Sequence, residues 1–148
     1  MKRFALGLAL AVTIPAGALV AQELPIVKQR QALMKNNGDQ AGIAGKMVKG
    51  ETDWDGAAAA AAMAKVAANA DELSALFPQG TETGFDTKVL PVIWEAKDDF
   101  NQRLTQLHER ALAAEQAAAG DLDAFRPAFT QLLDTCNGCH DKFREPWN

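Results

Sequence analysis

The sequence contains only two cysteines, Cys136 and Cys139, among its 148 residues. A disulfide between residues this close would constrain almost no chain, so the pair does not indicate a disulfide-stapled secreted scaffold. Beyond the first 21 residues no apolar stretch is long enough to span a bilayer, which excludes a multi-span membrane protein. Glycine and proline, at eleven and six, are too few for collagen or for long low-complexity disorder.

Positive charge is also scarce, because 15 basic residues face 19 acidic ones and the formal net charge is -4. Proteins that bind nucleic acid carry an excess of positive charge along one face or one segment. We therefore expect no nucleic-acid partner, and we interpret the acidic surface as solubilising.

Residues 1–21 have a basic start, an uncharged apolar stretch and small residues at the end, the order of a secretory signal. We predict a signal peptide there and one domain at residues 22–148, exported to the periplasm and without a membrane span. Cleavage at the end of the segment places Leu19 where a small residue is preferred, so Ala16–Ala18 is a second possible site. A retained anchor is a further alternative, which Pro15 disfavours.

Apolar residues recur at helical spacing in four segments, and no segment alternates as a strand does. The helices are expected at about residues 25–49, 54–77, 91–119 and 123–143. Asp53 is a possible cap of the second helix, and Phe85 is the expected apolar anchor of the loop at residues 78–90. Four helices of this length with short connections predict an all-α fold, an antiparallel four-helix bundle.

The string Cys136-Asn137-Gly138-Cys139-His140 is the attachment signature of c-type haem. On a helix Cys136, Cys139 and His140 share one face, so two thiols can reach two haem vinyl groups while the imidazole reaches the iron. The motif predicts one covalently attached haem c near the C-terminal end of the last helix, with His140 as an axial ligand. Two alternatives remain: a thioredoxin-like redox pair, and a zinc site that would need a further ligand such as His108.

The residue on the second face of the iron decides the function, because a methionine there gives an electron carrier and an open face binds small gases. The candidates are Met34, Met47, Met63 and His108. In an antiparallel bundle the early turns of the first helix pass the haem end, so Met34 is the best placed. Met47 and Met63 fit core positions, and His108 fits a boundary position.

The position of the haem motif in the last turns of a four-helix chain resembles the class II c-type cytochromes, the cytochrome c′ superfamily. The resemblance covers the chain after the predicted signal and includes Arg30-Gln31, Leu76-Phe77-Pro78 and Pro91-Val92-Ile93-Trp94. The family divides on the residue four after that arginine, which is often Leu in high-spin members and a ligand Met in low-spin members. Met34 holds this position and implies the low-spin branch, although a core methionine would give the same sequence.

The resemblance also implies roles for residues around the haem. Arg30 is expected to neutralise a haem propionate, with a solvated helix face as the alternative. Lys142 and Arg144 are expected to do the same or to rim the exposed haem edge where a partner docks. Trp94 and Phe143 are expected to pack on the macrocycle, and plain core packing is the alternative.

The function predicted from these residues is a one-electron carrier with a six-coordinate His/Met haem, not an enzyme and without catalytic residues. Its expected partners are redox proteins of the periplasm, and a homodimer through the Ala-rich face of the second helix is a further possibility. The main alternative is a high-spin protein that binds nitric oxide or carbon monoxide at a vacant distal face. A haem enzyme such as a peroxidase is disfavoured because no distal His with a supporting Arg can be assigned.

Overall fold

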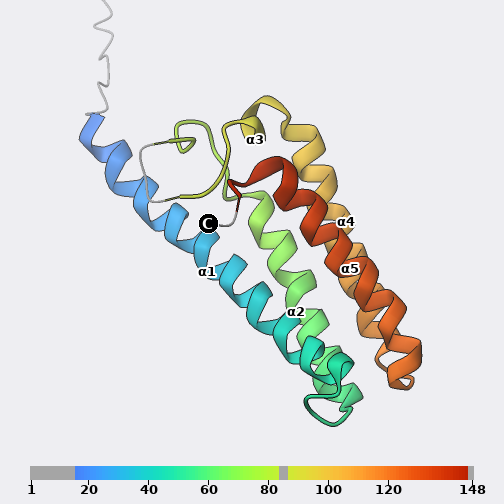
Figure 1. Ribbon diagram of the computed structural model, residues 1–148. Coiled ribbons are helices and arrows are strands. Elements are labelled where there is room, and N and C mark those ends of the chain that lie inside the picture. Colours follow the sequence, from blue (N-terminus) through green and yellow to red (C-terminus); the bar gives the residue numbers. More distant parts are fainter. Residues whose placement is uncertain (1–15, 84–86, 147–148) are drawn as a thin grey trace, which may run out of the picture.

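The computed structural model describes residues 16–83 and 87–146, with side chains from Pro25 onward. The first 15 residues of the predicted signal and Phe85, the expected anchor of the loop, lie outside the described residues. The helices are α1 (Ala16–Lys49), α2 (Gly56–Ser74), α3 (Val92–Glu95), α4 (Lys97–Ala117) and α5 (Leu122–Phe143) (Figure 1). The described residues contain no strand, only one isolated antiparallel bridge between Val89 and Arg144.

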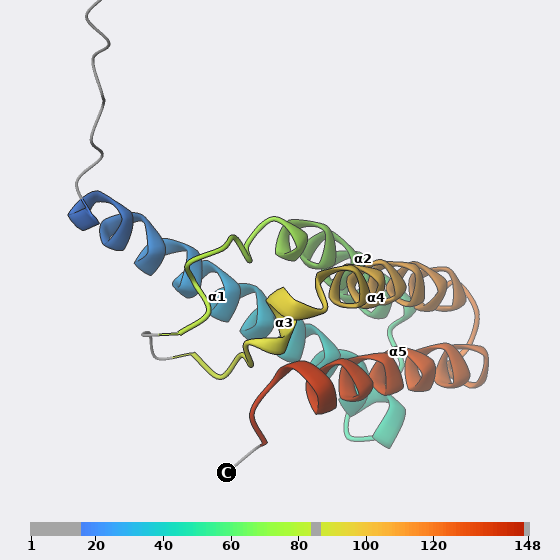
Figure 2. The same ribbon diagram turned by 90° about the horizontal axis from the view of Figure 1, so that it is seen from above.

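The four long helices form an antiparallel bundle, which confirms the predicted all-α fold. α1 packs on α2, α2 on α4 and α4 on α5, whereas α1 makes few contacts with α5. Figures 1 and 2 both show the chain between α2 and α3 running beside α1 at the end of the bundle near α3. None of the helices in the described part of the chain is both long and apolar enough to cross a bilayer.

The first helix begins at Ala16, so the predicted start near Pro25 is wrong. The residues before Pro25 are mostly helix formers, and the helix continues through Pro25 although this proline lacks an N–H donor and its ring crowds the preceding turn. The helix ends at Lys49 as predicted. Gly50 follows with φ of 75°, a left-handed conformation that glycine adopts without a steric penalty.

The second helix is capped by Asp55, so the prediction of Asp53 as its cap is wrong. The Asp55 carboxylate accepts a hydrogen bond of 2.9 Å from the backbone N–H of Ala58, the geometry of an N-cap. The helix ends at Ser74, three residues before the predicted end at Phe77. Residues buried on α2 follow the predicted stripe and include Ala59, Met63, Val66, Ala70 and Leu73.

The third predicted helix is interrupted, because Ala96 leaves the helical conformation with φ of −117° and ψ of 47°. The side chains on both sides of the break reach back to the chain just after α2. Trp94 Nε1 donates to the carbonyl of Pro78 at 2.8 Å, and Lys97 Nζ donates to the carbonyl of Phe77 at 3.2 Å. We attribute the break to these two contacts, which a straight helix would not make together.

The buried residues form two clusters along the bundle axis. The lower core consists of Ala44, Met47, Ala59, Ala62, Met63, Val66, Ala67, Ala70, Leu107, Ala111, Ala114, Ala118, Phe125, Phe129 and Leu132. The upper core, at the end near α3, consists of Leu73, Leu76, Phe77, Ile93, Phe100, Leu104 and Phe143. Met47 and Met63 are core residues as predicted, whereas the apolar Ile43 on α1 is 42% exposed.

On one face of α2, alanines pack inside the bundle. Ala59, Ala62, Ala67 and Ala70 are buried in the lower core, where their small side chains let helices approach closely. Other alanines of the helix are exposed, namely Ala57, Ala61 and Ala68. The homodimer through this helix stays a prediction, and these exposed alanines are the ones that remain for it.

Replacing the cap residue Asp55 by Ala should destabilise the protein by about 1 kcal/mol, the usual cost of losing an N-cap hydrogen bond. Urea unfolding of the holoprotein measures this loss. Asp53→Ala is the matched control and should leave the free energy of unfolding nearly unchanged. Equal losses in the two variants would contradict the assignment of the cap.

Candidate haem site

The two cysteines lie in the last two turns of α5 as half-buried free thiols. Cys139 packs against the upper core and Cys136 against the lower core. Burial raises the pKa of both thiols, that of Cys139 to about 11. Both side chains are therefore neutral S–H groups at neutral pH.

His140 follows the second cysteine and is also half-buried. Burial lowers the pKa of its imidazole, and the positive charge of Arg144 lowers it further against the opposite effect of Asp141. The neutral imidazole is thus the favoured form, and it is the form whose free nitrogen lone pair binds a metal.

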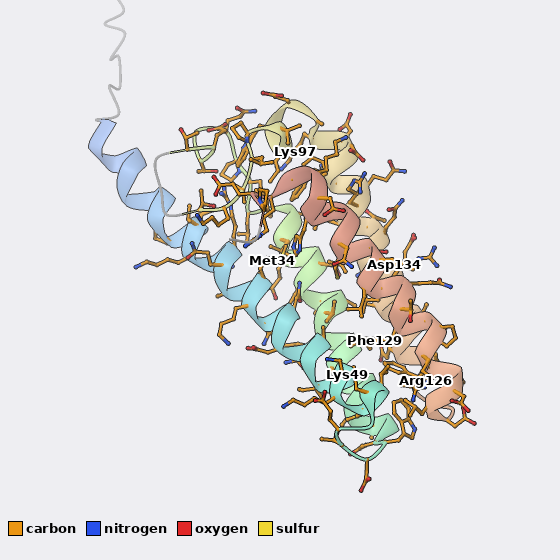
Figure 3. The ribbon with its side chains drawn as sticks, in the orientation of Figure 1. Met34, Lys49, Lys97, Arg126, Phe129 and Asp134 are labelled. Atoms are coloured by element: carbon orange, nitrogen blue, oxygen red, sulfur yellow. The ribbon has the colours of Figure 1, made fainter. Side chains whose placement is uncertain are left out.

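Met34 on α1 packs against the same upper core as Cys139 on α5. Met47 and Met63 belong to the lower core. Figure 3 shows Met34 between the labelled Lys97 near α3 and the labelled Lys49 and Arg126 at the opposite end of the bundle. Among the described methionines, Met34 is therefore the one that shares a cluster with the Cys139 end of the motif.

Arg30, one turn before Met34, is only 3% exposed, so the alternative of a solvated helix face is wrong. Its Nε donates to the carbonyl of Leu76 at 2.5 Å and its Nη1 to the carbonyl of Thr81 at 3.2 Å. Its Nη2 also donates to the hydroxyl of Thr81. The guanidinium thus fixes the start of the loop after α2, a contact that the sequence did not reveal.

Two cations lie close together at this end of the bundle. Burial lowers the pKa of Arg30 to about 10, against the opposite effect of Glu82. The pKa of Lys97 is lowered by burial and then by the charge of Arg30. Neither cation has a carboxylate within salt-bridge distance in the described part of the chain. This surplus of positive charge favours an anionic group at the site.

A continuous stack of side chains joins α1 to α5 through the upper core. The Arg30 guanidinium lies 4.3 Å from the ring centroid of Phe77. The rings of Phe77 and Phe100 are 4.6 Å apart, and those of Phe100 and Phe143 are 5.3 Å apart, both edge to face. Trp94 borders the stack, 5.8 Å from Phe77. The stack brings Arg30, Trp94 and Phe143 together, while their contact with haem stays a prediction.

Asp99 and Arg103 were not predicted as site residues, yet both connect α4 to the haem motif. Arg103 Nη1 donates to the carbonyl of Gly138 within the motif at 2.9 Å. Asp99 accepts from Arg103 Nε at 3.2 Å and from Lys142 Nζ at 2.6 Å. The spacing of Asp99 and Arg103 indicates a pair on one helix face, but only the fold shows that this pair reaches α5.

The two alternative interpretations of the cysteines gain no support. A thioredoxin-like pair requires a βαβ context, and the described residues are helical. In residues 25–83 and 87–146 no three His, Cys, Asp or Glu side chains come together as metal ligands. His108, the candidate for a further zinc ligand, instead places its Nδ1 3.0 Å from Asp71 Oδ1.

Comparison with known proteins decides the family, since a family model described as Cytochrome C′ matches residues 25–144. The chain belongs to the cytochrome c′ family. It is 35% identical over 133 residues to a cytochrome c′ of Rhodopseudomonas palustris, covering 90% of both chains. It is 34% identical over 138 residues to a cytochrome c-554 of Cereibacter sphaeroides, again covering 90% of both.

A solved structure supports the same assignment. The cytochrome c′ of R. palustris superposes with a TM-score of 0.79 and 33% identity, covering 83% of this chain and 98% of the other. The predicted resemblance to class II c-type cytochromes and the predicted bundle are both confirmed. Membership makes the chain a haem protein of the electron-transferring or gas-binding kind, with haem c as the cofactor, one per chain.

The residues of this cytochrome c′ family member fit haem c by their chemistry. The free thiols of Cys136 and Cys139 are the groups that form thioethers, and the neutral imidazole of His140 suits iron. Arg30 and Lys97 supply positive charge of the kind that propionates need. Each of these groups has the chemistry that the cofactor requires.

The ion pairs of Asp99 predict that the free energy of unfolding depends on pH. Its pKa is lowered from 3.8, first by the hydrogen bond from Lys142, so its ion pairs stabilise the fold above the unfolded-state pKa. This stabilisation is lost as the pH falls through the lowered folded-state pKa. Asp99→Asn should therefore reduce the free energy of unfolding at pH 7, and the difference from wild type should shrink toward pH 3.

Urea unfolding of the holoprotein across this range measures the effect, with Asp98→Asn, an exposed neighbour, as the control of equal charge change. A difference that stays constant with pH, or that is equal for the two variants, would rule out a structural role for the Asp99 ion pairs.

Proposed function

We propose that this cytochrome c′ family member is an exported one-electron carrier whose haem iron is bound by His140 and Met34. The observation that carries the proposal is the packing of Met34 and Cys139, from α1 and α5, against one upper core. The two other described methionines lie in the lower core and offer no alternative thioether at this end. Met34 also holds the position four after Arg30 at which the resemblance implies a methionine ligand and the low-spin branch.

The two proposed ligands suit one-electron transfer without a catalysed reaction. Haem c supplies a one-electron couple between ferrous and ferric iron. The thioether of Met34 would favour the ferrous form, and the imidazole of His140 would bind the iron as the other protein ligand. Because both side chains stay in place in either oxidation state, little rearrangement of the protein accompanies transfer, so no catalytic residue is required.

The thiols of Cys136 and Cys139 are proposed to hold the cofactor covalently. Each sulfur would bond to one carbon of a vinyl group, with the thiol proton passing to the neighbouring carbon. The addition would exchange one S–H bond and one carbon–carbon π bond for one C–S and one C–H bond, so it needs neither an oxidant nor a reductant.

Positive groups around the site have proposed roles in charge balance and docking. Three of the five N–H donors of Arg30 serve Leu76 and Thr81, which leaves two for a propionate. Lys142, whose side chain is 44% exposed, lies beside the motif and suits contact with a redox partner. The periplasm as location rests on the signal-like residues 1–21, and the partners are proposed to be redox proteins there.

Replacing Met34 by Leu should abolish the long-wavelength methionine-to-iron charge-transfer band of the oxidised holoprotein. The reduced protein should then bind carbon monoxide, because leucine cannot ligate iron and leaves that face open. Visible absorption of both oxidation states, with and without carbon monoxide, measures both effects. Met63→Leu, a change of the same kind in the lower core, should leave the spectrum unchanged.

A high-spin spectrum of the wild-type protein that shifts on adding carbon monoxide would contradict the proposal. It would favour the second function open to this family, gas binding at a vacant distal face, with Met34 as a core residue.

Replacing both Cys136 and Cys139 by Ser should abolish covalent attachment, because a hydroxyl does not add to a vinyl group as a thiol does. Mass spectrometry of the denatured chain measures attachment directly. Met34→Leu is the control variant. It keeps both thiols, so its denatured chain should retain the full mass of chain plus haem. Retention of haem mass by the double variant would show that other residues attach the cofactor.

A further inference from the structure

The position of α1 relative to α5 depends on α2. α1 makes few contacts with α5 and packs chiefly along α2, which packs on α4, which in turn packs on α5. The proposed iron ligands are Met34 on α1 and His140 on α5. If that proposal holds, the seam between α1 and α2 decides whether the Met34 thioether reaches the iron.

One buried side chain on α2 makes specific polar contacts across this seam. Asn69 is 3% exposed. Its Nδ2 donates to Asn36 Oδ1 at 2.8 Å and to Asn37 Oδ1 at 2.7 Å. Both acceptors lie on α1 within one helical turn after Met34, so the amide cluster sits next to the proposed ligand along the helix.

Apart from Asn69, the polar contacts of α1 on this side include those of Arg30 with Leu76 and Thr81 in the loop after α2. The residues that α2 itself adds to the lower core are mostly alanines, whose contacts are small and without direction. A shift of α1 by one turn, about 5.4 Å, would replace one alanine contact by another. The same shift would leave the buried amide of Asn69 without its acceptors, and buried polar groups are costly when unpaired.

We propose that Asn69 is a positioning residue that fixes the register of α1 on α2 and so holds Met34 at the haem iron. The inference rests on the proposed His/Met function. It assigns to Asn36, Asn37 and Asn69 a role for which apolar residues of similar size would not serve, since a single buried polar contact is an effective determinant of helix register.

The test is Asn69→Leu, which keeps a similar volume and removes both hydrogen bonds. In the oxidised holoprotein the methionine-to-iron charge-transfer band should weaken, and carbon monoxide should bind the reduced protein more tightly. We expect a change in affinity of about tenfold, which corresponds to about 1.4 kcal/mol and is the scale expected for the loss of the two buried hydrogen bonds. Absorption spectra and carbon monoxide titration measure these effects.

Val66→Ala is the matched control, because Val66 is buried on α2 one turn earlier and makes only apolar contacts in the lower core. It should lower stability in urea unfolding and leave the band and the carbon monoxide affinity at wild-type values. Asn37→Ala, at a half-buried position on α1, removes one acceptor and should give a smaller change in the same direction as Asn69→Leu.

The outcomes are distinguishable. A wild-type protein without the charge-transfer band overturns the His/Met proposal and this inference with it. A wild-type protein with the band, together with an Asn69→Leu variant that keeps both the band and the affinity, overturns the role of Asn69 alone. If Asn69→Leu does not yield holoprotein, Asn37→Ala decides, and wild-type ligation in that variant overturns the inference.

Discussion

The stack of Arg30, Phe77, Phe100 and Phe143 is the interaction on which the proposed site depends. It joins α1, the end of α2, α4 and α5 through contacts of 4.3, 4.6 and 5.3 Å. Because α1 and α5 make few contacts with each other, this stack and the seam with α2 provide the connection between the two faces proposed for the iron. The site is therefore a property of the whole upper end of the bundle.

The electrostatics of this end follow from the same packing. The stack buries Arg30 beside Lys97, and neither has a carboxylate partner in the described part of the chain. Near Phe143, at the other end of the stack, Asp99 pairs with both Arg103 and Lys142, and Arg103 reaches the carbonyl of Gly138 in the motif. The Arg30 end thus offers positive charge to a cofactor, while the Phe143 end holds the attachment turn through ion pairs and hydrogen bonds.

Much of this could be predicted from the sequence, because helical periodicity and the Cys136 to His140 spacing both depend on residues close in the chain. Periodicity identified the buried stripe of α2 and the burial of Met47 and Met63. The break in the third predicted helix was missed because distant residues decide it. Ala96 leaves the helix while Trp94 and Lys97 bond to carbonyls in the chain after α2, and no local pattern indicates this.

The candidate site likewise contains residues that the sequence predicts and residues that only the fold brings together. The attachment motif and Met34 were predicted from local spacing and from resemblance to a family. The partners of Arg30 in the loop after α2, the contact of Arg103 with Gly138 and the amides around Asn69 all join residues more than 30 positions apart. Such contacts follow from the three-dimensional packing of the helices and have no signature in a single sequence.

The most direct test of the central claim is the spin state of ferric iron in the wild-type holoprotein at neutral pH, measured by electron paramagnetic resonance. Ligation by His140 and Met34 predicts a low-spin signal alone, because two strong axial ligands leave no open face. A dominant high-spin signal would contradict the account, since it would mean that Met34 packs against the upper core without binding the iron.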